Sequence, residues 1–212
     1  MDDDQIRLIE SEADLAEGCA HLIRVCPVWA RVLPDLSPLP LRRGPDGFEA
    51  LQSAVASQQL SAQAADTIIG RLRAAGLMQA DAFLAADDEA LRACGLSRPK
   101  IRYLRGIAAA GIDWQGLRRL PDAEVTRQLT ALPGIGRWTA EIYLKFALGR
   151  ADAFAAGDLA LQEAARVLYD LEARPSAGTL EEMAEPWRPW RSVAARALWS
   201  YYRVTKGREG VT

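Results

Sequence analysis

Hydrophobic positions along the chain recur mostly every three or four residues, which is the spacing of one face of an α-helix. The pattern predicts an amphipathic helix over residues 12–33 and two more over about 48–57 and 61–74. Between them, residues 34–47 hold four prolines and two glycines, which are typical of a loop or linker. Two short helices follow within 79–111. No stretch has a convincing strand pattern, so the sequence predicts an all-α fold.

A break in this periodicity at residues 133–136 (Pro-Gly-Ile-Gly) separates two helical patterns. Proline lacks an amide donor and glycine accepts positive φ, so the break predicts a tight hairpin between helices. The second helix runs to about residue 148 and carries a polar stripe, with Glu141 and Lys145 at ion-pair spacing. Because Gly134 and Gly136 lack side chains, a phosphate could approach the amides that open this helix. A capping turn without a ligand explains the same short motif.

The 212 residues carry a net charge of −2, but the charge is unevenly distributed. Residues 1–17 have a net charge of −6, whereas 98–150 have +6 and 186–212 have +5. The two basic stretches coincide with the candidate motifs, as a surface that follows phosphates would require; solvated helix charge is the alternative. No apolar stretch is long enough to span a membrane and the chain starts Met-Asp-Asp-Asp, so we expect a cytoplasmic protein.

The string Leu-Pro-Gly-Ile-Gly-Arg-Trp-Thr-Ala at 132–140 resembles the hairpin of the helix-hairpin-helix DNA glycosylase superfamily, and its Trp resembles the alkylpurine branch, the DNA-3-methyladenine glycosylase II type. Segments 57–61, 154–161 and 187–192 are similar to family segments in the same order. The resemblance implies two helical subdomains that flank an active-site cleft, without the N-terminal sheet domain of the common bacterial form. We expect one domain over 1–212, with a hairpin subdomain at about 50–150 and the other lobe formed by 1–49 and 151–212.

The resemblance also implies roles for individual side chains. Asp158 matches the catalytic aspartate, although its spacing alone predicts a helix N-cap; the two roles are compatible. Trp138 and Trp199 match positions that flank the flipped base, whereas the residue type alone favours a core position. Tyr143 lies next to a third pocket position of the family. Gln59 matches the residue that wedges into the duplex, whereas its local sequence alone favours a polar turn.

The same resemblance extends to chemistry and ligands. Family members that also cleave the strand carry a lysine where this chain has Trp138, so we expect a monofunctional enzyme that hydrolyses the N-glycosidic bond of an alkylated purine such as 3-methyladenine. The DNA backbone would contact Gly134, Ile135 and Gly136. No cofactor is expected beyond an optional Na or K ion, whose backbone carbonyl ligands would belong to Thr130, Leu132 and Ile135.

The cysteines and the expected partners bear on metal binding and assembly. The three cysteines have no metal-ligand spacing and none follows Cys94, so we expect no iron–sulfur cluster. We expect double-stranded DNA as the partner of a monomer, with no membrane and no obligate protein partner. Two other classes remain open: a non-catalytic helix-hairpin-helix DNA-binding protein and an all-α interaction module. The first would need neither Asp158 nor the tryptophan pair.

Overall fold

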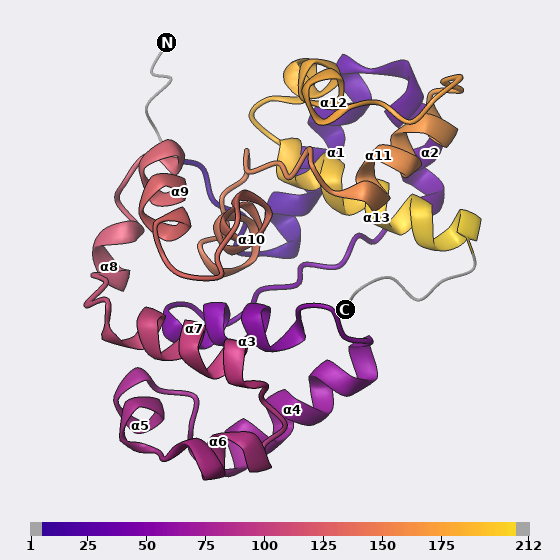
Figure 1. Cartoon of the computed structure of the whole chain (residues 1–212). Helices are drawn as coiled ribbons and strands as arrows, with labels where there is room; N and C mark the ends of the chain where they lie inside the picture. Colours follow the sequence, from indigo (N-terminus) through magenta and orange to yellow (C-terminus); the bar gives the residue numbers. More distant parts are fainter. Residues whose placement is uncertain (1–5, 207–212) are drawn as a thin grey trace. The chain divides into compact units, whose positions relative to one another are not determined.

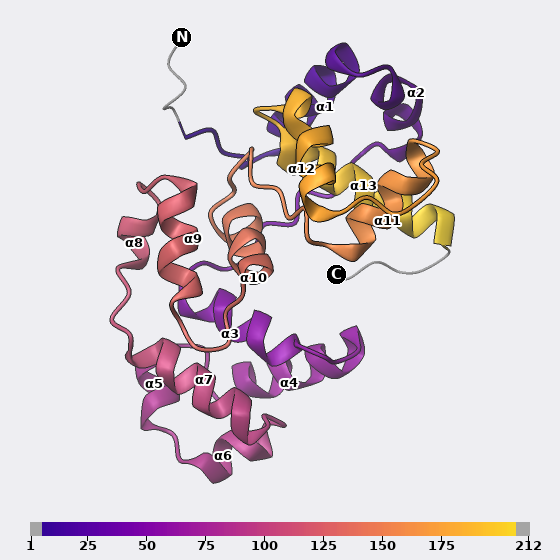
Figure 2. The same ribbon diagram turned by 45° about the horizontal axis from the view of Figure 1, so that its top comes forward.

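The computed structural model of the chain describes residues 6–206, in which helices are joined by loops and turns (Figures 1 and 2). The described residues contain no strand, and their one isolated β-bridge joins Leu8 to Arg150. The chain forms two compact units: unit 1 comprises the residues up to Arg43 and from Leu144 onward, and unit 2 is the continuous segment Gly44–Tyr143. No described helix is long and apolar enough to cross a membrane.

Unit 2 is a helical assembly around α7. Its helices are α3 (Phe48–Ser57), α4 (Ala62–Ala74), α5 (Ala80–Ala85), α6 (Asp88–Ala93), α7 (Arg98–Ala109), α8 (Trp114–Leu117), α9 (Asp122–Thr130) and α10 (Arg137–Ile142). Helices α3, α5 and α6 pack against α7. Phe48 and Phe83 meet in the core with ring centroids 5.6 Å apart. The buried aliphatic residues of α7 face these helices, as their spacing predicts.

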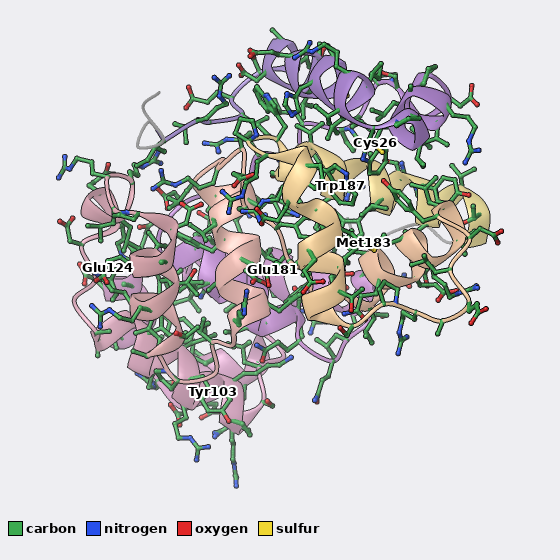
Figure 3. All side chains as sticks on the ribbon, turned by 90° about the horizontal axis from the view of Figure 1, so that it is seen from above. Cys26, Tyr103, Glu124, Glu181, Met183 and Trp187 are labelled. Atoms are coloured by element: carbon green, nitrogen blue, oxygen red, sulfur yellow. The ribbon has the colours of Figure 1, made fainter. Side chains whose placement is uncertain are left out.

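Unit 1 combines both ends of the described chain. It contains α1 (Glu12–Val25), α2 (Pro27–Leu36), α11 (Leu159–Leu168), α12 (Ala177–Ala184), the 3₁₀ turn η2 (Glu185–Trp187) and α13 (Arg191–Lys206). Helix α13 packs along α11 and α1. Its close approach to α1 requires Gly18, because a Cβ there would lie 2.5 Å from Val193. Trp187, labelled in Figure 3, belongs to the hydrophobic core of this unit, and the partly buried Cys26 and Met183 pack against that core.

The junctions between the units fall six or seven residues before the expected positions, about 50 and 150. Helix α10 continues into a π-helical turn, η1 (Tyr143–Ala147), and the division follows Tyr143. The segment after it belongs to unit 1 because the amide of Ile9 donates to Gly149 and the amide of Ala151 donates to Arg7. These main-chain bonds attach residues 149–151 to the N-terminal part of the chain.

Two stretches contain one more helix than the sequence pattern predicts. Residues 12–33 form α1 and α2 instead of one helix, because Pro27 has no amide to continue α1 and instead occupies the first position of α2. Residues 79–111 form α5, α6 and α7. Asp87 caps α6 by accepting from the amide of Ala90, and this N-cap starts a helix that the hydrophobic pattern does not predict.

Candidate active site

The hairpin between α9 and α10 is the first candidate element, and its local geometry explains its glycines. Gly134 has φ +78°, and a Cβ on it would lie 2.7 Å from the ring of Tyr103 on α7. Gly136 precedes α10 with φ −92° and open space around it, and no side chain caps the helix. The turn thus needs glycine at position 134 for its backbone conformation and its packing, whereas neither backbone conformation nor packing requires glycine at position 136.

The turn that carries Gln59 is attached to the same hairpin. The side-chain amide of Gln58 donates to the carbonyl of Gly134 at 3.1 Å. Lys100 on α7 donates to the carbonyls of Ala56 and Gln58 at 2.8 and 2.9 Å, and burial lowers its pKa. Gln59 itself is exposed and has φ +58°. The main chain that leads into the exposed Gln59 is therefore fixed by Lys100.

Trp138 and Tyr143, both expected near a base, have different surroundings within unit 2. Trp138 stands in the first turn of α10 and is 44% exposed, which is unusual for an indole. Tyr143 is 3% exposed; its hydroxyl donates to Asp46 and accepts from the amide of Gly47. Burial and the contact with Asp46 raise the pKa of Tyr143. Tyr143 is thus placed as a core residue of unit 2.

Asp158 caps α11, as its spacing predicts. Its Oδ1 accepts from the amides of Ala160 and Leu161 at 2.8 and 3.1 Å, and the side chain is half-buried. Its own amide donates to the carbonyl of Ala155. The side chain of Gln162 donates to the carbonyl of Ala156 at 2.8 Å. The loop before Asp158 is therefore tied to the helix that follows it.

A second set of contacts attaches this loop to residues 187–192. Phe154 packs edge-on against Trp187 with ring centroids 5.9 Å apart. The amide of Ser192 donates to the carbonyl of Ala151. Both oxygens of Asp152 accept from Arg191, whose Nε and Nη2 lie 2.9 and 2.7 Å away. The segment that the sequence singled out at 187–192 thus fixes the loop that leads to Asp158.

Trp199, on α13, has a half-buried side chain whose ring is stacked on Phe146, with centroids 5.7 Å apart and planes at 22°. The ammonium of Lys145 lies 4.2 Å from the centroid of the Trp199 ring, and Lys145 is 0% exposed. Lys145, which its spacing places on the polar stripe of this helix, is therefore buried. Lys145 lies within the π-helical turn η1, which is wider than an α-helix and spaces its side chains differently.

Many cations of the basic stretches have partners within the protein. Those with internal partners or complete burial are Lys100, Arg105, Arg137, Arg188, Arg191 and Arg196. Arg98 and Arg102 on α7 are exposed. Arg102 lies 5.5 Å from the ring centroid of Tyr103, the residue that contacts Gly134. The net charge of these stretches therefore includes cations that are engaged inside the protein.

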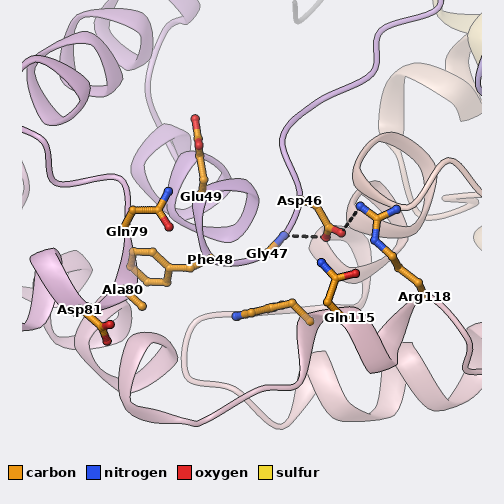
Figure 4. A pocket seen from close by; sticks show the side chains of 10 residues that line it. Asp46, Gly47, Phe48, Glu49, Gln79, Ala80, Asp81, Gln115 and Arg118 are labelled. Atoms are coloured by element: carbon orange, nitrogen blue, oxygen red, sulfur yellow. Dashed lines mark hydrogen bonds and ion pairs between the residues drawn. The ribbon is translucent and has the colours of Figure 1, made fainter.

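A cavity of about 370 Å³ in unit 2 contains none of the predicted site residues (Figure 4). Its lining includes Trp114, Gln79 and the ion pair between Asp46 and Arg118, whose atoms are 2.5 Å apart. Trp114 also contacts Tyr143, with ring centroids 6.2 Å apart. The cavity thus borders the same core contacts that hold Tyr143.

Within residues 6–206, no group of three or more His, Cys, Asp or Glu side chains could hold a metal ion. The backbone carbonyls of the hairpin are the predicted ligands of a monovalent cation. That of Leu132 accepts the amide of Ile135 at 3.3 Å, which leaves its second lone pair for another ligand. The carbonyl of Leu132 is thus compatible with a monovalent cation.

The structure therefore groups the candidates into two sets. Unit 2 holds Gln59, the hairpin and Trp138, and unit 1 holds Asp158 and Trp199. An all-α chain with a glycine hairpin and a helix capped by an aspartate after it belongs to the helix-hairpin-helix class. Residues 52–189 match the family described as the HhH-GPD superfamily base excision DNA repair protein, and the chain belongs to this family.

Relatives cover nearly the whole chain. DNA-3-methyladenine glycosylase 1 of Schizosaccharomyces pombe is 36% identical over 90% of this chain and 89% of its own length. The S. pombe 3-methyladenine DNA glycosylase solved in complex with abasic DNA has a TM-score of 0.76 at 32% identity, covering 90% of this chain and 97% of that one. A DNA-3-methyladenine glycosidase of Bacillus halodurans has a TM-score of 0.73 at 29% identity, covering 96% and 95%. The predicted family and all-α fold are confirmed, and these relatives support a base-excision repair glycosylase.

Proposed function

We propose that this protein is a monofunctional DNA glycosylase that flips alkylated purines such as 3-methyladenine out of duplex DNA and hydrolyses their N-glycosidic bond. A base inside a duplex cannot be reached, so an enzyme acting on it must extrude it into a pocket. Relatives over nine-tenths of the chain are named as glycosylases of this kind. A non-catalytic DNA-binding protein, the alternative, is not favoured by any of these names.

Asp158 is the residue on which the proposed chemistry depends. Departure of the base leaves positive charge on the sugar, and a nearby carboxylate stabilises this charge and orients the attacking water. The support is the position of Asp158 at the N-terminus of α11, where two amides hold Oδ1, together with the contacts that fix the preceding loop. A fixed carboxylate needs no reorganisation as the charge develops, which is the property such a role requires.

The tryptophans and the wedge are proposed to hold the DNA open. Trp138 and Trp199 would face the flipped base, and Gln59 would fill the gap in the duplex and hydrogen-bond the orphaned partner base. Exposed hydrophobic side chains support this, because Leu60 beside Gln59 is 41% exposed, Trp138 is 44% exposed and Leu159 beside Asp158 is 62% exposed. Such side chains gain when they stack on bases. We propose no base contact for Tyr143, because its hydroxyl is engaged by Asp46 and the amide of Gly47.

The hairpin is proposed to bind the backbone of the duplex. The amides at Gly134, Ile135 and Gly136 would contact a phosphate, and such contacts position DNA without reading its sequence. The carbonyls of Thr130, Leu132 and Ile135 would hold a monovalent cation that strengthens this contact. Trp138 stands where strand-cleaving members of the family carry a lysine, so we expect an abasic site as the product and no strand cleavage.

The test is base excision from duplex oligonucleotides that carry a single alkylated purine, compared between wild type and Asp158→Asn. We expect wild type to release the base and leave an intact strand that breaks only after alkali treatment. The Asn variant should retain the N-cap, because its carbonyl can accept from the same amides, and should lose at least about 100-fold in rate. Affinity for abasic DNA serves as the control. Unaltered excision by the variant would remove Asp158 from this role, and binding without excision by wild type would favour the non-catalytic alternative.

A further inference from the structure

The turn that carries Gln59 is a type II turn in which Gln59 occupies the position that usually requires glycine. Gln58 has φ −53° and ψ 131°, and Gln59 follows with φ +58°. The amide of Leu60 donates to the carbonyl of Ser57 at 3.2 Å and closes the turn. Glycine and asparagine adopt the positive φ of this position readily, whereas glutamine is strained there. Such strain persists only where the surrounding structure holds the backbone.

The competing conformation is a type I turn, in which the peptide between Gln58 and Gln59 is rotated by about 180°. This rotation brings φ of Gln59 to about −90°, which relieves the strain and changes the direction of the side chain. It also turns the carbonyl of Gln58 to the opposite side of the turn. The orientation of this one carbonyl therefore distinguishes the two conformations.

Lys100, on α7, binds that carbonyl. Its ammonium donates to the carbonyl of Gln58 at 2.9 Å and to that of Ala56, in the last turn of α3, at 2.8 Å. The last carbonyls of a helix have no partner within the helix, and a cation beside them is favoured by the helix dipole. The side-chain amide of Gln58 also donates to the carbonyl of Gly134 at 3.1 Å. The strained turn is thus held by Lys100 and attached to the hairpin.

From these contacts we infer that Lys100 is a positioning residue that holds Gln59 in the conformation in which it enters the duplex. The inference rests on the proposed function, because it requires Gln59 to fill the gap left by an extruded base. Loss of the ammonium should shift the turn toward type I, since hydrogen bonds from a charged donor are stronger than those between neutral groups. A decrease of about 10-fold in the competent conformation lowers extrusion by the same factor. Lys100 acts through the turn and takes no part in breaking the glycosidic bond.

The experiment compares Lys100→Met with wild type on two duplexes that differ only opposite the damaged base. In one duplex 7-methylguanine is paired with cytosine, and in the other it lies opposite a tetrahydrofuran abasic analogue and has no pairing partner. Single-turnover excision rates are measured at saturating protein, and the ratio of the paired to the unpaired rate is the readout. We expect Lys100→Met to lower this ratio by about 10-fold, because an unpaired base costs less to extrude. A defect in stability or in the chemical step alone would lower both rates equally.

Three further variants serve as controls. Lys100→Arg keeps the charge and enough donors for both carbonyls, so its ratio should stay within about 3-fold of wild type. Arg98→Met removes an exposed cation from the same helix and should leave the ratio unchanged. Lys100→Gln is a second neutral variant, in case methionine at this half-buried position impairs folding, and it should lower the ratio as well.

Gln59→Ala connects the ratio to the wedge. It should lower the ratio by itself, and Lys100→Met should lower it no further in this background, because both changes act through one side chain. A loss in Gln59→Ala with an unchanged ratio in a folded neutral Lys100 variant, or an additive loss in the double variant, refutes the inference alone. A wild-type ratio in Gln59→Ala refutes the wedge and the inference with it. Wild type that excises from neither duplex refutes the proposed function, on which the inference rests.

Discussion

Replacing Asp152 with asparagine tests whether the ion pair between Asp152 and Arg191 positions the loop that leads to Asp158. Both carboxylate oxygens of Asp152 accept from Arg191, which is buried apart from 11% of its side chain. Hydrogen bonds to a charged group contribute about 1.5–3 kcal/mol each. Asparagine retains one acceptor, so we expect a loss of about 2 kcal/mol in the free energy of unfolding. The second partner, Arg188, is 54% exposed and adds little.

This loss should be visible in thermal unfolding followed by circular dichroism. A chain of this size loses about 2–4 °C in Tm per kcal/mol, which gives a decrease of about 4–8 °C for Asp152→Asn. The matched control is Glu17→Gln, which removes an ion pair with Arg7 between side chains that are 61% and 47% exposed. We expect this control to change the stability by less than about 0.5 kcal/mol.

Excision at a temperature well below Tm provides the second readout. A displacement of about 1 Å at a catalytic group can cost about 100-fold in rate, so even partial loosening of the Asp158 loop should lower excision at least 10-fold. Equal Tm values for Asp152→Asn and Glu17→Gln would refute the assigned energy. A lowered Tm with unchanged excision would show that the ion pair stabilises the fold without positioning Asp158.

Two further predictions concern the hairpin and the first helix. Gly134→Ala should lower the free energy of unfolding by about 1–3 kcal/mol in a denaturant titration, because position 134 combines positive φ with a steric overlap. Gly136→Ala has open space around it and should keep its stability. If backbone amides bind phosphate, Gly136→Ala should still weaken DNA binding in a fluorescence anisotropy titration, and unchanged affinity would count against that contact. The hydrogen bonds from the amide of Glu10 and the hydroxyl of Ser11 hold the pKa of Asp14 below 3.8. Asp14 therefore stabilises the folded state above pH 3.8 and loses this contribution as the pH falls through its lower folded-state pKa. Asp14→Asn should flatten the acid limb of a plot of unfolding midpoint against pH, and an unaltered limb would contradict the capping-box contribution.

Local patterns predicted the elements that depend on neighbouring residues. The hairpin followed from Pro and Gly at 133–136, and the N-cap role of Asp158 followed from the helical pattern after it. The apolar stripe of α13 is buried as its spacing predicts. Such features could be read from the sequence because their causes lie within a few residues of each other.

Features that depend on distant residues could not be predicted in this way. The sequence gives no sign that Lys100 binds carbonyls some forty residues earlier, or that Arg191 pairs with Asp152 thirty-nine residues away. Lys145 illustrates the difficulty most clearly, because a lysine at helical spacing from Glu141 usually indicates a solvated surface. The π-helical turn that contains it and its contact with Trp199 have no signature in the hydrophobic pattern.

The insertion of one unit within the other has a consequence for synthesis of the chain. Unit 2 is a continuous stretch of 100 residues, from Gly44 to Tyr143. Helices α1 and α2 pack with α13, which is synthesised after all of unit 2. Helices α1 and α2 must therefore wait until α13 has been synthesised before their apolar faces are covered, while the hairpin unit can complete its own core first.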